Sequence, residues 1–258
     1  MSRIKWDEIG TRFFETGLDH GVLFIRDEDG YRNGVPWNGL VSVTETSSGA
    51  DANPMYADDI KYLNLIAAED FGATIEAYTY PDEWSECEGF ADISTGATIG
   101  QQLRKTFGLS YQTRKGNDVA GTDYGYKIHL VYGVLASPSD RGYQSINDNP
   151  DAITFSWTVT TTPLNVPGKK PTAHLVIDSV KTDPQILSML EDLIYGREAS
   201  SGKDAIDSRL PTPEAVLYIL AHGTLYQEND EPLLDSSGNP ILDHTNAAIQ
   251  ACHMTLVA

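Results

Sequence analysis

A run of alternating apolar and polar residues in the middle of the chain predicts a long β-hairpin. Residues 108–133 hold two such runs, joined by the connector GNDVAGTDYG. Its glycine, asparagine and aspartate residues tolerate positive φ or bond their own backbone, so the chain can reverse there. One face of the second strand carries Tyr126, Ile128, Leu130, Tyr132 and Val134, and the other carries Lys127, His129, Val131 and Gly133. This period of two is typical of a strand.

Five further segments are predicted to be strands. They cover residues 20–27, 35–46, 73–80, 152–162 and 173–180. The first two are expected to pair, because strands that are neighbours in sequence often pair. In the fourth, the inward positions are expected to be Ile153, Phe155, Trp157 and Val159, with serine and threonine outward. The chain is therefore expected to be mainly β.

Capping residues predict two helices after the last of these strands. Asp183 and Pro184 begin the first and Gly196 ends it. Its apolar stripe consists of Ile186, Leu187, Leu190, Leu193 and Ile194. Thr212 begins the second, over residues 213–222. Residues 197–210 are interpreted as a polar linker between a β domain, residues 1–196, and a C-terminal extension, residues 211–258, lying on that domain or on a neighbouring subunit.

The segment 47–72 shows no clean period of two and is interpreted as a long loop between strands. Ile60, Leu63 and Ala67 have the spacing of a short helix within it. Its apolar content argues against disorder. A loop of this length in a compact domain is usually functional. The alternative is that it folds back as a cover over its own sheet.

Several of these segments together resemble the major tail protein of long-tailed, non-contractile bacteriophages. The likeness covers roughly residues 6–195 and includes the hairpin, DIKYLNL at residues 59–65, FGATIEAYTYPDEW at 71–84 and SINDNPDAITFSWTVTTTP at 145–163. It implies a tail-tube β-sandwich or small barrel with one flanking helix. The subunits of that family form hexameric rings that stack into the tube through which DNA is delivered.

The same resemblance implies where such a chain acts and what it contacts. Its main partner would be itself, followed by other tail proteins such as the tape measure, terminator and distal tail proteins. It would be assembled in the host cytoplasm and reside in the virion tail, with DNA passing through but not specifically bound. The long loop would mediate ring stacking, through Met55, Tyr56, Ile60, Tyr62, Leu63 and Ile66.

The formal net charge of −19 argues against a protein that binds nucleic acid, because such binding needs clustered Lys and Arg. In a conduit, carboxylates along the lumen would keep DNA from adhering. The alternative is simply a solvated acidic surface. Cys87 and Cys252 stand far apart and are expected to be free thiols. No apolar run is long enough to span a membrane, and synthesis in a reducing cytoplasm is expected.

Sequence motifs for catalysis or metal binding are missing, so neither an enzyme nor a cofactor is expected. No nucleophile elbow, phosphate-binding loop or zinc-protease motif occurs. His129 is interpreted as structural or solvated, and Asp27, Glu28 and Asp29 as part of a hairpin turn, not a calcium loop.

Two other classes of protein remain open as alternatives. The first is a carbohydrate-binding or adhesion β-sandwich, which would display Trp37, Tyr126, Tyr132, Phe155 and Trp157 as a platform; packing of these aromatics in the core is the commoner arrangement. The second is a hydrolase with an unrecognised site, which predicts histidines or carboxylates converging in a cleft.

Overall fold

The computed structural model describes residues 3–28, 30–143, 145, 152–199 and 205–223. A nine-stranded antiparallel sheet dominates it, which confirms the expectation of a mainly β chain. Its main path runs in the order β2, β1, β10, β11, β12, β7, β4, while β3 pairs with β1 and β13 pairs with β11. The strands are β1 (Phe13–Asp27), β2 (Gly30–Tyr31), β3 (Val35–Pro36), β4 (Leu40–Gly49), β7 (Glu69–Ala77), β10 (Phe107–Asn117), β11 (Gly121–Ala136), β12 (Phe155–Thr161) and β13 (His174–Asp178).

The predicted hairpin is confirmed as β10 and β11, and β11 is where the sheet divides into two layers. Residues Lys127–Val131 of β11 pair with β13, whereas Val134–Ala136 pair with β12. The division occurs at Gly133, which has φ +58 and a backbone so close to Thr162 that a Cβ would lie 2.2 Å from the Thr162 carbonyl oxygen. Only glycine combines this φ with this approach.

The bulge at Gly133 corrects the expected faces of β11. Ile128, Leu130 and Tyr132 do share one face, but Val134 packs with Val131 on the opposite one. An inserted residue at a bulge shifts the alternation, so strict counting by two fails beyond it.

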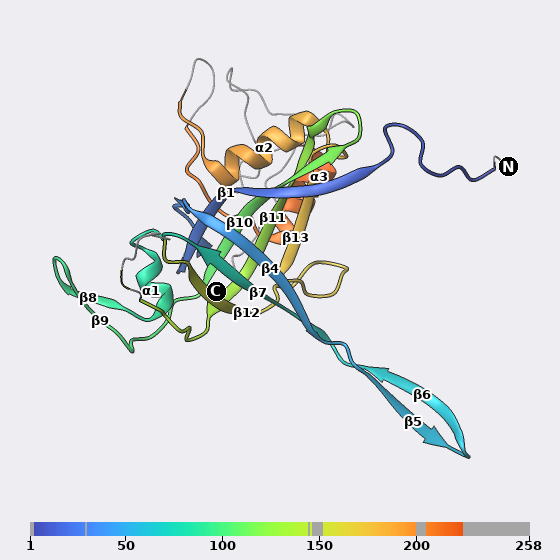
Figure 1. Ribbon diagram of the computed structural model, residues 1–258, viewed down its shortest axis with the longest axis horizontal. Coiled ribbons are helices and arrows are strands. Elements are labelled where there is room, and N and C mark those ends of the chain that lie inside the picture. The colour runs from blue at the N-terminus through green and yellow to red at the C-terminus, as the bar shows by residue number, and fades with distance from the viewer. Residues whose placement is uncertain (1–2, 29, 144, 146–151, 200–204, 224–258) are drawn as a thin grey trace.

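Two hydrophobic cores lie on the two faces of the layer formed by β1, β10, β11 and β13. The first fills the space toward β4, β7, β12 and the short helix α1 (Trp84–Glu88), and it centres on Trp37, Trp84, Phe107 and Trp157. The second lies under two helices, α2 (Pro184–Tyr195) and α3 (Pro213–His222). The layers are therefore sheet, sheet and helices (Figure 1).

Both predicted helices are confirmed at their expected boundaries. The Asp183 side chain accepts a hydrogen bond from the Gln185 N–H at 2.9 Å, and the Thr212 side chain accepts one from the Ala215 N–H at 3.3 Å. The α3 residues Val216 and Ile219 are fully buried beside α2. Two helices, α2 and α3, thus flank the sheet where one was expected. Helix α3, which belongs to the predicted C-terminal extension, packs on the sheet domain, which we call the body. Residues 224–258 of the extension lie outside the described residues.

Several details of the predicted strands are wrong. Strand β1 begins at Phe13, well before residue 20. Its expected pairing with the segment 35–46 holds only at the start of that segment, β3, because the remainder, β4, pairs with β7. Ile153, expected to point inward, precedes β12 and is 37% exposed.

The predicted linker is anchored to the sheet domain: Arg197 forms a β-bridge with Ile206, and Leu210 is buried. Within the described residues, no helix has the length and apolar character needed to cross a membrane.

The interpretation of residues 47–72 as a loop with a short helix is wrong. This segment contains the end of β4, the start of β7 and between them a two-stranded ribbon, β5 (Ala52–Ala57) with β6 (Ile60–Ile66). Asp58 and Asp59, with φ +52 and +61, form the tight turn at its tip. Two central residues with positive φ are typical of the turn that matches the strand twist. We call β5 and β6 the arm; it projects from the body in Figure 1. A smaller hairpin, β8 (Ala91–Ser94) with β9 (Ala97–Ile99), lies on another side.

Gly49 joins the arm to the body, and we predict that its replacement distorts this junction. Gly49 has φ +76, and a Cβ there would lie 2.4 Å from the Ala68 carbonyl oxygen. The turn glycine Gly96 has a similar φ, +81, but open space around it. Gly96→Ala should cost only the backbone strain, about 1–2 kcal/mol. Gly49→Ala should cost measurably more in urea unfolding and should raise protease cleavage at the base of the arm. Equal costs for the two variants would contradict this account.

Candidate functional site

All six residues predicted for the stacking interface lie on the arm, and all six are exposed. Their exposed fractions run from 37% for Leu63 to 71% for Tyr56. The arm therefore does not fold back over its own sheet, and that alternative is wrong. Leu65, 54% exposed, belongs to the same surface and was missed because the sequence offered no register for the segment.

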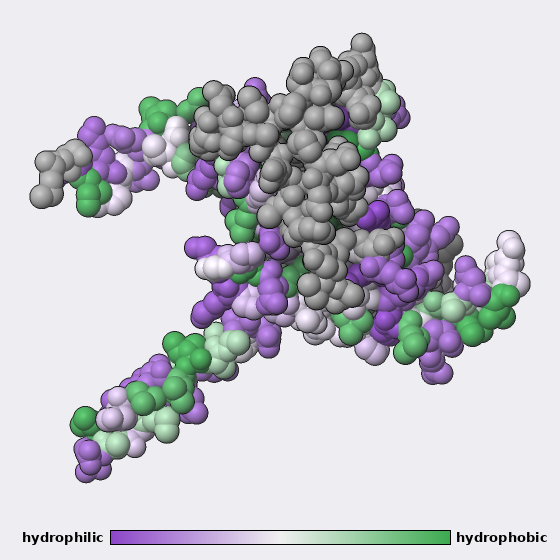
Figure 2. Space-filling view, turned by 180° about the vertical axis from the view of Figure 1, so that it is seen from behind, coloured by the Kyte–Doolittle hydropathy of each residue, from purple (hydrophilic) through white to green (hydrophobic). Residues whose placement is uncertain are grey.

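The pairing register distributes the apolar side chains over both faces of the arm. Leu63 and Leu65 share a face of β6, and Met55 pairs opposite Leu63. Ile66 and Tyr56 lie on the other face. A register shift between Met55 and Tyr56 changes the alternation of β6, so that Ile60, which pairs with Ala57, lies on the same face as Met55. Figure 2 shows apolar side chains along the projecting arm. Neither face of the ribbon is covered by the body.

The aromatic platform expected of a carbohydrate-binding module is not formed. Trp37, Tyr132 and Trp157 are at most 3% exposed, and they pack within the two cores. Tyr126 and Phe155 are partly buried against those cores. The preference for core packing is confirmed.

Cys87 is a buried free thiol in the first core, as expected. Burial raises its pKa to about 12, so the thiol stays protonated and unreactive at neutral pH. Cys252 lies outside the described residues.

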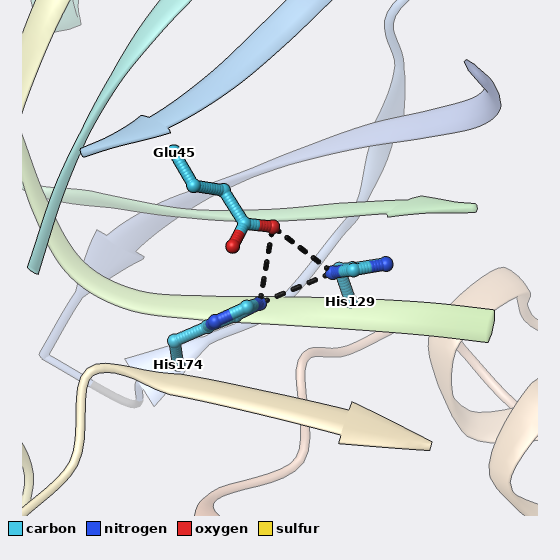
Figure 3. A group of neighbouring side chains, drawn as sticks. All are labelled: Glu45, His129 and His174. Atoms are coloured by element: carbon cyan, nitrogen blue, oxygen red, sulfur yellow. Dashed lines mark hydrogen bonds and ion pairs between the residues drawn. The ribbon is translucent and has the colours of Figure 1, made fainter. Parts of the chain in front are cut away.

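A cluster of two histidines and a glutamate lies where β4 crosses β11 and β13 (Figure 3). Nδ1 of His129 is 3.2 Å from Nε2 of His174 and 3.2 Å from Oε1 of Glu45, and the latter two atoms are 3.7 Å apart. From the sequence alone, His129 is interpreted as structural or solvated, and the cluster is not predicted. Residues 45, 129 and 174 are too far apart in sequence for any motif, and only the fold brings them together.

Aromatic rings and hydroxyl groups surround the cluster. The Tyr111 ring stacks on His129 with centroids 4.6 Å apart, and the Phe71 ring stacks on His174 at the same distance. The Tyr111 hydroxyl donates to Oε1 of Glu45 at 2.6 Å, and the Thr113 hydroxyl lies 3.0 Å from Nε2 of His129.

Burial sets the protonation of the two histidines. Desolvation, followed by repulsion from His174, lowers the pKa of His129 to about 4. Desolvation also lowers the pKa of His174. Both imidazoles are therefore neutral near pH 7, with lone pairs available to a ligand.

The contacts of His129 also have the order of a catalytic triad, from the Thr113 hydroxyl through the imidazole to Glu45. This partly meets what the hydrolase alternative predicts. A general base works best with a pKa near the operating pH. At a pKa of about 4, His129 is a weak base, so this arrangement favours a ligand role over proton transfer.

Comparison with known proteins found no matching family model and no matching curated protein. Several solved structures are similar to the chain, and two of them illustrate the likeness. A chain of the PVC sheath–tube complex, an extracellular contractile injection system in its extended state, shares 12% identity at a TM-score of 0.28; the match covers 68% of this chain and 94% of that one. The PVC sheath/tube terminator shares 11% at a TM-score of 0.27, covering 68% and 99%. Scores this low establish no shared function.

Proposed function

We propose that this chain is the structural subunit of a phage-like tail tube, which assembles by contacts between copies of itself. One observation carries the proposal: the arm extends from the body with apolar side chains on both faces and no described partner for either. Exposed apolar patches of this kind usually mark interaction surfaces.

The energetics of the arm favour a partner. A two-stranded ribbon is marginally stable in water by itself. Each large side chain that a neighbour buries contributes roughly 1.5 to 3 kcal/mol before ordering costs. Six to seven such side chains, repeated at every contact of a lattice, are enough to hold subunits together.

Other exposed features give the subunit contacts in more than one direction. The N-terminal segment exposes Ile4, Trp6 and Ile9, each at 70% or more, and the β8–β9 hairpin exposes Ile93 at 64%. These segments leave the body on different sides from the arm (Figure 1). Among the described residues, β4 and β13 each pair with a single strand, so their free edges are open to strand addition. A ring whose sheets join at such edges would close into a barrel.

The finer form of the proposal follows the sequence resemblance. The rings would be hexameric and stack through the arm into the tube of a long non-contractile tail, with tape measure, terminator and distal tail proteins as further partners. The chain would be assembled in the host cytoplasm and would function in the virion, in DNA delivery. The net charge of −19 supports a lumen that does not retain DNA.

The subunit is further proposed to have no enzymatic activity. The support is the low pKa of His129, which makes the triad-like contacts a poor base at neutral pH.

Removing the arm should abolish tube formation without unfolding the body. Replacing residues 51–67 by a short Gly-Ser linker removes β5 and β6 and closes the gap between Ala50 and Ala68, which already share a backbone hydrogen bond of 3.2 Å. Electron microscopy of concentrated protein should show rings or tubes for the full chain. For the shortened chain it should show no tubes, while circular dichroism should lose only the contribution of β5 and β6 and keep the β signal of the remaining sheet.

Point variants separate loss of apolar area from general damage to the arm. Tyr62→Ser removes a 68% exposed ring and should weaken association at least tenfold, whereas Asn64→Ser on the same strand should leave it within about twofold. Normal tubes from the shortened chain would overturn the assignment of the arm. The absence of any self-association of the full chain would overturn the proposed function.

Duplex DNA should not be retained by the assembled protein at physiological salt. Nonspecific DNA binding depends on Lys and Arg that neutralise phosphates, and this chain carries 18 such residues against 37 carboxylates. A gel-shift titration should show no complex up to about 100 μM protein. Micromolar binding that weakens as salt rises would contradict the proposed acidic lumen.

A further inference from the structure

We propose that Glu45, His129 and His174 form a binding site for one divalent transition metal ion, with zinc as the best match. The inference does not depend on the proposed function and departs from the sequence-based expectation of no metal. Zinc is bound by histidine nitrogen and carboxylate oxygen, and two histidines with one glutamate are among its known ligand sets.

The separations of the three ligand atoms match those around a tetrahedral ion. At metal–ligand distances of about 2.0–2.1 Å, the ligands of a tetrahedral zinc lie about 3.3 Å from one another. The observed separations are 3.2, 3.2 and 3.7 Å. All three atoms converge on one point (Figure 3). One ion fits there without rearrangement of the three strands.

Hydrogen bonding alone satisfies this triangle poorly. With both imidazoles neutral, a proton on Nδ1 of His129 can be shared with Glu45 and His174 only as a bent, bifurcated bond. With the proton on Nε2 instead, Nδ1 of His129 can accept from Nε2–H of His174 at 3.2 Å, but it then faces the Glu45 oxygen at 3.2 Å, acceptor against acceptor. A cation at the centre attracts all three atoms.

The neighbouring hydroxyls are placed as supporting contacts of a metal site. Ligand histidines usually donate their second N–H to an oxygen, which fixes the tautomer, and ligand carboxylates are themselves hydrogen-bonded. Thr113 lies at hydrogen-bond distance from Nε2 of His129, which leaves Nδ1 free for metal, and Tyr111 donates to Glu45. The Glu45 side chain is 39% exposed, so solvent supplies the fourth ligand.

A metal here would connect the two sheet layers at the base of the arm. Glu45 lies on β4, four residues before Gly49, whereas the histidines lie on β11 and β13. The ion would therefore hold strand β4, close to the start of the arm, against the layer that contains β11 and β13.

Metal binding by the full-length protein tests the site directly. After treatment with chelator and dialysis, Zn²⁺ is titrated against a chromophoric competitor, and Co²⁺ is titrated by its visible absorption, which is intense for a four-coordinate ion. The wild type should bind a Co²⁺ ion with such a spectrum, and Zn²⁺ should displace it. His174→Gln and Glu45→Gln should each weaken binding about 100-fold or more and remove that spectrum.

A matched control uses a histidine that is not part of the cluster. His20 is exposed and has φ +51, so His20→Asn keeps a residue that tolerates this backbone. It should leave the affinity within about twofold. Zn²⁺ should also raise the melting temperature of the wild type and of His20→Asn, but not that of His174→Gln or Glu45→Gln.

Two results would overturn the site. One is a wild type that binds neither ion at micromolar concentration. The other is binding with unchanged affinity in His174→Gln and Glu45→Gln, which would place the metal elsewhere in the chain. Circular dichroism establishes that each variant is folded, and because Glu45 is partly exposed, Glu45→Gln serves alone if His174→Gln does not fold.

Discussion

The antiparallel pairing of β4 with β7 is the interaction on which the rest of the structure depends. It runs in register from Ser42 opposite Glu76, beside the tryptophan core, to Gly49 opposite Glu69, where burial has ended. Near the tryptophan core, the β4–β7 pair is held by the packing of Ile75 against the first core. Farther out, the pair is held by the backbone hydrogen bonds between its two strands. The same ribbon carries Glu45 to the two histidines and carries the arm into solvent. The β4–β7 ladder and the separate β5–β6 ladder that follows it thereby join the core, the histidine–glutamate cluster and the candidate interface.

How much the sequence predicts depends on whether an element has a buried face. Strands β10 and β11 and helices α2 and α3 each pack at least one face on a core, and their periodicity and caps located them. The arm has no buried face, so its sequence does not alternate between apolar and polar residues. For this reason the sequence alone indicates a loop with a helical turn in this segment. Its apolar content was still recognised, and the six predicted residues do lie together there. The histidine–glutamate cluster could not be predicted from the sequence, because its three residues lie on separate strands and come together only through the pairing and packing of those strands.

The bulge at Gly133 shows how one residue decides a larger arrangement. Before it, β11 pairs with β13 and directs Ile128 and Leu130 under the helices; after it, β11 pairs with β12 and directs Val134 into the other core. Without that change of partner, β12 and the β7–β4 ribbon would not turn across the face of β11. Glu45 would then not face His129 and His174. A backbone conformation available to glycine thus determines both the two-layer body and the place of the cluster.

In the proposed assembly, contact through the arm would set a short-range attraction against a long-range repulsion. Subunits that each carry a net charge of −19 repel one another over about 10 Å at 0.1 M salt, whereas apolar burial acts only on contact. In that assembly, the repulsion would keep free subunits with exposed arms from associating indiscriminately. The projecting arm would reduce the effect of this repulsion, because its apolar side chains lie beyond the rest of the subunit (Figure 1). Two subunits could then make contact through the arm before their acidic surfaces come close. An acidic body with an apolar projection is therefore suited to ordered association at defined points, and poorly suited to nonspecific aggregation.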